Sequence, residues 1–161
     1  MITEELQTAQ HRWLMQLVGD WTSEMEYQGP DGQPQKHTGK ESVRSLGGIY
    51  TVAEGKGEMG CSGGEATSIL TLGYDPKKEK FVGTFVASMM THLWVYEGSL
   101  DSTGKILTLD TVGPDFTSST MAKYQDILEF VSEDHRTMKS QVLGPDGKWI
   151  HFMTANYRRV K

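Results

Sequence analysis

Residues 19–27, GDWTSEMEY, decide the fold, because from Asp20 onward the side chains alternate with a period of two. One face of this run carries Trp21, Ser23, Met25 and Tyr27, and the other carries Thr22, Glu24 and Glu26. Such alternation is typical of a half-buried β-strand. Further extended runs follow, separated by short turns that include the tetrapeptide GPDG at 29–32 and 144–147; they cover 35–46, 49–58, 66–74, 80–88, 92–100, 105–112, 120–131, 136–143 and 148–158.

These runs predict a mainly β protein of about ten strands in which neighbours along the chain pair in space. A meander of this length leaves two unpaired edges unless it closes, so we expect a closed antiparallel up-and-down barrel over residues 20–158. A β-sandwich is the alternative, but it needs long crossing connections, and the sequence shows none. We predict a single barrel domain over residues 1–161, wide enough to leave some interior space.

One helix is predicted before the first strand, over about residues 4–18. Thr3 is a suitable N-cap, and Gly19 can end the helix in the left-handed conformation. The apolar residues fall at helical spacing and form one stripe: Leu6, Ala9, Trp13, Leu14, Leu17 and Val18. We expect this stripe to cover one mouth of the barrel as a lid.

Composition and charge exclude several classes of partner. The 161 residues carry a formal net charge of -5, and the longest basic run is Arg158-Arg159, which argues against nucleic acid and anionic membranes. Residues 1–10 lack the apolar core of a signal peptide, and Cys61 is the only cysteine, so we expect a cytoplasmic location. Cys61 lies in a glycine-rich loop without a neighbouring base, which favours a thiol without a catalytic role. A homo-oligomer remains open.

The tripeptide Gly19-Asp20-Trp21 resembles the opening signature of the lipocalin and fatty-acid-binding superfamily. The resemblance implies that Trp21 closes one barrel end and packs against an arginine from the last strand. Arg158 and Arg159 both stand where that partner is expected. A guanidinium stacked on an indole ring stabilises a fold by about 0.5–2 kcal/mol, so we predict a structural role for these residues.

Five longer segments carry a closer resemblance: HRWL at 11–14, ESVRSLGG at 41–48, VAEG at 52–55, TLGYDP at 71–76 and LWVYEG at 93–98. In order and spacing they are similar to the bacterial family catalogued as domain of unknown function 1579. That resemblance covers nearly the whole chain and implies a lipocalin-like, or calycin-like, barrel. It implies no established activity, and therefore no catalytic residue.

Asp126 is the most unusual inward residue. In 120–131 the inward face is predicted to hold Ala122, Tyr124, Asp126, Leu128 and Phe130. A charged carboxylate without a partner in an apolar interior costs several kcal/mol, so Asp126 should be paired, hydrated or protonated. Arg44 and the backbone are possible partners, and a purely structural pair is the alternative to a ligand-binding role.

The run 92–100 has an aromatic face with His92, Trp94 and Tyr96 and an opposite face with Leu93 and Val95. We favour the aromatic face as the inward one, where a few polar groups would orient an apolar guest. The alternative places Leu93 and Val95 beneath the helix.

The candidate ligand-binding residues are then Arg44, Glu54, Met90, His92, Trp94, Tyr96, Tyr124 and Asp126. Glu54 could instead form a structural pair with Arg44 or Lys56.

The five histidines are scattered without metal-ligand spacing, so we predict no metal and no cofactor. Haem with His92 or His151 as axial ligand is a less favoured alternative.

We rank three functions: binding of a small, largely apolar molecule, then a structural or interaction domain with a filled barrel. Third comes a small lyase, isomerase or hydrolase with Asp126 or Glu54 as general base beside Tyr96 or His92.

Overall fold

The computed structural model describes residues 6–28, 32–58 and 64–161. The predictions for Thr3 and Cys61, and part of the first GPDG turn, lie outside this range. The described part contains one helix, α2 (Ala9–Met15). Its ten strands are β1 (Gly19–Gln28), β2 (Pro34–Leu46), β3 (Tyr50–Glu58), β4 (Glu65–Asp75), β5 (Lys80–Ala87), β6 (Trp94–Leu100), β7 (Ile106–Pro114), β8 (Met121–Ser132), β9 (His135–Leu143) and β10 (Trp149–Arg159).

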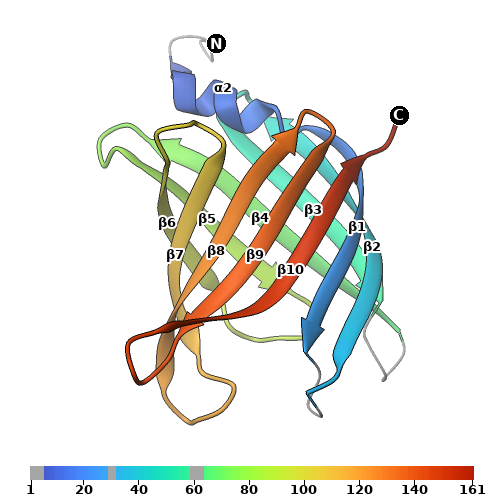
Figure 1. Ribbon diagram of the computed structural model, residues 1–161. Helices are drawn as coiled ribbons and strands as arrows, with labels where there is room; N and C mark the ends of the chain where they lie inside the picture. The colour runs from blue at the N-terminus through green and yellow to red at the C-terminus, as the bar shows by residue number, and fades with distance from the viewer. Residues whose placement is uncertain (1–5, 29–31, 59–63) are drawn as a thin grey trace.

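The ten strands form a closed barrel in which sequence neighbours pair throughout. β1 closes it by pairing with β2 on one side and with β10 on the other, so that Trp21 stands opposite both Glu41 and Arg159. Every pair is antiparallel. The structure therefore confirms the predicted up-and-down barrel and not the sandwich (Figure 1).

Helix α2 is shorter than predicted. Thr8 is extended, with φ -97° and ψ 175°, and acts as the N-cap in a reciprocal capping box with His11. The prediction of one continuous helix over 4–18 is therefore wrong at Thr8. Its backbone is extended, and its hydroxyl accepts a hydrogen bond from the His11 amide. After Met15 the chain tightens, and the amides of Leu17 and Val18 bond three residues back. No helix in the described residues has the length and apolarity needed to cross a lipid bilayer.

Helix α2 lies across one end of the barrel, as the lid hypothesis expected (Figure 1). Leu14 of this helix and Leu17, which follows it, are buried, at 0% and 3% exposure. Trp13 meets Phe81 and Phe130 edge to face and donates its indole N–H to the Gly104 carbonyl at 2.7 Å. These contacts close this end, which we call the helix end.

Trp21 supports the helix end from inside the barrel. It is 1% exposed and lies between two arginines, with Arg159 at 4.3 Å and Arg136 at 4.6 Å from its ring centroid. Of the two expected partners, Arg159 stacks on Trp21, whereas Arg158 is exposed on the outer wall. Gly19 has φ +137°, and a Cβ there would lie 2.6 Å from the Arg159 guanidinium, so the glycine makes room for the stack.

Candidate ligand-binding cavity

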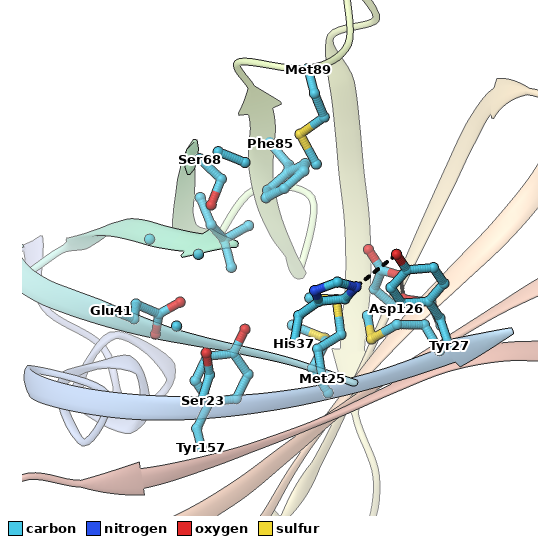
Figure 2. Close-up of a pocket in the computed structure, with 18 of the residues that line it drawn as sticks. Ser23, Met25, Tyr27, His37, Glu41, Ser68, Phe85, Met89, Asp126 and Tyr157 are labelled. Atoms are coloured by element: carbon cyan, nitrogen blue, oxygen red, sulfur yellow. Dashed lines mark hydrogen bonds between the residues drawn. The ribbon is translucent and has the colours of Figure 1, made fainter. Parts of the chain in front are cut away.

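Beyond Trp21 the barrel is hollow. The cavity has a volume of about 880 Å³, and it extends to Met89 and Phe116, whose exposures of 52% and 72% mark its open end. Ligand pockets begin at roughly 300 Å³, so a cavity of this size does not fit the alternative of a filled barrel. Figure 2 shows side chains of β1, β2 and the opposite wall pointing into the same space.

The cavity exists because small residues occupy inward positions on one wall. Gly39, Gly55 and Gly57 face inward on β2 and β3, with Ser23 on β1 and Ser68 on β4 beside them. A Cβ at Gly39 would lie 2.7 Å from the Lys56 carbonyl oxygen, and one at Gly55 would lie 2.8 Å from the Ser68 hydroxyl. The two strands therefore approach closely and project nothing into the interior.

Asp126 stands in the cavity wall and accepts two hydrogen bonds. The Ser140 hydroxyl donates to Oδ1 at 2.5 Å, and the Tyr96 hydroxyl donates to Oδ2. Burial raises the pKa of Asp126 above its ordinary value, while the bonds from Ser140 and Tyr96 act in the opposite direction. Burial, and then the charge of Asp126, raises the pKa of the Tyr96 phenol. The expected partner Arg44 is not there, because it is exposed on the outer wall next to inward Val43.

The aromatic face of β6 points inward, as favoured. Trp94 and Tyr96 are 7% and 3% exposed, whereas Leu93 and Val95 are 53% and 58% exposed, so the alternative that placed the latter beneath the helix is wrong. The Trp94 ring stands edge-on to Tyr124 at 5.1 Å. Its indole N–H donates to the Met90 sulfur at 3.1 Å. Gly113 leaves space for this ring, which any side chain there would overlap.

The structure divides the remaining candidates. Met90 and Tyr124 line the cavity together with Trp94, Tyr96 and Asp126. His92 lies beside this group, edge-on to Trp94 at 4.7 Å, with its Nε2 bonded to the Val112 carbonyl at 3.0 Å. Glu54 is exposed on the outer wall, because its neighbours Ala53 and Gly55 are the ones that turn inward. The placement of Arg44 and Glu54 in the binding site is therefore wrong.

Neither residue considered as a haem ligand enters the cavity. His92 bonds to the backbone of β7, and exposed His151 bonds to the Thr154 hydroxyl at 2.7 Å. The described residues also contain no group of three or more His, Cys, Asp or Glu arranged to hold a metal ion.

The cavity floor is an ion pair that sequence reasoning missed. Arg136 is 2% exposed and pairs with Glu41, which is 11% exposed. The Arg136 guanidinium also lies 4.1 Å from the Tyr157 ring centroid, on the stack that includes Trp21. Its Nε–H is buried without a partner. The available signal was the period of β9, which puts Arg136 on the face of Met138 and Ser140.

A second missed pair lies toward the open end. Tyr27 and His37 stack with their ring centroids 5.2 Å apart, and the Tyr27 oxygen lies 2.9 Å from His37 Nε2 (Figure 2, dashed line). The His37 Nδ1 is buried without a partner. The alternation of β1 placed Tyr27 on the same face as Trp21, but nothing in the sequence indicated that His37 would meet it.

Together these features define a closed ten-stranded antiparallel barrel with one covered end and a ligand-sized cavity in the other part. The chain belongs to the family described as Protein of unknown function (DUF1579), whose model matches residues 7–159. The resemblance seen in the five sequence segments is thus confirmed.

Solved structures share the fold at low identity. The S-type phycobiliprotein lyase CPES from Guillardia theta has a TM-score of 0.62 and 14% identity, over 98% of this chain and 96% of that one. Rv2717c from M. tuberculosis has a TM-score of 0.61 and 12% identity, over 96% and 99%. EF1p2_mFAP2b bound to DFHBI has a TM-score of 0.50 and 14% identity, over 93% and 98%. No curated protein matched the chain.

Proposed function

We propose that this protein binds a small, largely apolar molecule inside its barrel. The observation that carries the proposal is the cavity of about 880 Å³, which falls within the usual range of roughly 300–1,000 Å³ for ligand pockets. A lipocalin-like barrel is the scaffold that this function would use. The single cysteine supports placing this function in a reducing compartment such as the cytoplasm.

The lining chemistry supports an apolar guest with one polar end. Met25, Met90, Met138 and Met153 line the cavity, and methionine side chains adapt to ligands of irregular shape. The aromatic group formed by Trp94, Tyr124 and Phe152 adds flat apolar surface. The Asp126 cluster supplies the few polar atoms that fix orientation in such pockets.

The structural neighbours support this capacity without indicating a ligand. One barrel of the same fold was solved bound to the small molecule DFHBI, and another is a phycobiliprotein lyase. The lyase, isomerase or hydrolase alternative loses Glu54 and retains Asp126 beside Tyr96. It ranks below binding because two of its candidate residues, Glu54 and His92, do not line the cavity.

The test is to fill the cavity and leave the fold intact. Ser68→Trp would place an indole in the cavity, and Ile69→Trp would place the same ring on the outer wall, where Ile69 is 38% exposed. We expect the neutral fluorophore N-phenyl-1-naphthylamine to bind the wild-type protein saturably. Its affinity should fall at least about tenfold in Ser68→Trp, a difference of ~1.4 kcal/mol, and hold in Ile69→Trp.

Native mass spectrometry of freshly purified protein would provide the second measurement. A bound small molecule in the wild type that is lost in Ser68→Trp supports the proposal. A wild-type barrel that is always empty, together with equal fluorophore affinity in both variants, would refute it.

A further inference from the structure

The charges that face the cavity do not balance. The inward carboxyl and guanidinium groups are those of Glu41, Asp126 and Arg136, and Glu41 and Arg136 pair with each other on the floor. Lys40, Lys56 and Glu58 border the cavity but are exposed to solvent. None of the ion pairs among the described residues includes Asp126. Among the described residues, Asp126 is therefore the one inward carboxylate that forms no ion pair with a lysine or an arginine.

The hydrogen bonding of Asp126 also leaves capacity unused. An ionised carboxylate has about four acceptor positions, and Asp126 receives only the bonds from Tyr96 and Ser140. The Thr111 hydroxyl lies on β7, which pairs with β8 so that Leu109 stands opposite Asp126 and Thr111 opposite Tyr124. Thr111 lines the cavity and is 7% exposed, and its hydroxyl has no hydrogen-bond partner. A ligand group that donates to Asp126 could also bond to this hydroxyl.

Aromatic rings lie between Asp126 and the open end. Tyr124 is two residues from Asp126 on the same inward face, with Trp94 at 5.1 Å and Phe152 at 6.0 Å from its ring. The faces of such rings carry partial negative charge and attract cations. A positively charged group would thus be stabilised along this route as well as at its end.

We infer that the apolar ligand carries a protonated amine, which pairs with Asp126 while its apolar part lies among Trp94, Tyr124 and the methionines. This inference rests on the proposed function and specifies its ligand class. An anionic ligand is disfavoured because it would add a negative charge near Asp126 while Arg136 is already committed to Glu41. The raised pKa of Asp126 agrees with a carboxyl group that lacks a cation.

The experiment compares three probes with one skeleton: 4-phenylbutylamine, 4-phenylbutan-1-ol and 4-phenylbutanoate. Each competes with N-phenyl-1-naphthylamine at neutral pH. We expect the amine to bind at least about tenfold more tightly than the alcohol, or ~1.4 kcal/mol, and the carboxylate to bind most weakly. This order is measured on the wild-type protein and does not depend on any variant.

Matched variants locate the preference. Asp126→Asn should abolish the advantage of the amine over the alcohol. Asp110→Asn makes the same change of net charge at an exposed residue of β7, and should keep the full preference. Circular dichroism and fluorophore binding confirm that each variant is folded.

The outcomes separate the two proposals. Equal affinity for amine and alcohol in the wild type, or a preference that survives Asp126→Asn, overturns the amine inference and leaves the binding function standing. Failure of the fluorophore and all three probes to bind overturns both.

Discussion

The two ends of the barrel are built from the same alternating strands but differ in what the inward residues are. At the helix end the inward positions hold large side chains, and Phe81, Leu107 and Leu128 are 2%, 0% and 0% exposed. At the open end the corresponding positions on one wall are glycine or serine, and the interior is a cavity. Alternation decides which residues face inward, but side-chain volume decides whether a barrel is filled.

This difference divides stability and binding along the barrel axis. The helix end is closed by α2 and by the stack of Arg159, Trp21 and Arg136. At the open end the wall of glycine and serine leaves the interior unfilled, so this end can hold a guest without losing a core. Arg136 lies at the boundary, because it contacts Trp21 on one side and lines the cavity on the other.

The largest effect is expected at that boundary. Arg136→Met removes the positive charge and leaves Glu41 enclosed without its partner, so the free energy of unfolding should fall by about 3–5 kcal/mol. Urea denaturation followed by tryptophan fluorescence measures it. Replacing both partners, as Arg136→Met with Glu41→Leu, should recover most of the loss because no charge is then left unpaired. A loss below about 1 kcal/mol in the single variant would mean that the pair does not hold the floor.

A smaller effect compares the two ends directly. Leu14→Ala at the helix end should cost about 2–5 kcal/mol, because it opens a cavity in a filled core. Met25→Ala at the open end should cost about 1 kcal/mol or less, because Met25 already borders empty space. Parallel urea titrations of both variants test the contrast. Equal losses would show that the two ends do not differ in packing.

Much of the fold could be predicted because it follows from local alternation. Period two alone grouped Trp21 with the other inward residues of β1 and placed Asp126 on the inward face of β8. Glu54 was misplaced because Ala53 and Gly55, its neighbours in β3, are the residues that face inward. The helix was predicted to begin too early because Thr8, which caps it, was counted as a helical residue.

The site could be predicted only in part, because it depends on the register between strands. Ser140 meets Asp126 since the two are directly opposite in the β8–β9 ladder, and no local pattern indicates that pairing. Glu41 and Arg136 are far apart in the sequence, and isolated charges in strands usually face solvent. Once the barrel closes through β1 and β10, both turn out to lie on the inward face.

The smallest expected effect is the pH dependence that Asp126, in the cavity wall, gives to the free energy of unfolding. Burial raises the pKa of Asp126 above its ordinary value of 3.8, so the folded protein holds this proton at pH values where the unfolded chain has lost it. The free energy of unfolding should therefore fall as pH rises from about 4 to the folded pKa, and level off above it. Asp126→Asn removes this titration, so its stability relative to the wild type should increase with pH across that window.

Urea titrations between pH 4 and pH 8 measure this difference, with Asp110→Asn as the control that makes the same substitution at an exposed residue. A constant difference for Asp126→Asn would show that Asp126 ionises as freely in the barrel as in the unfolded chain. The cavity would then hydrate its carboxylate fully, and the amine inference would lose its electrostatic basis. A difference that grows with pH and disappears on saturation with 4-phenylbutylamine would instead link the cost of the unpaired charge to the cation that relieves it.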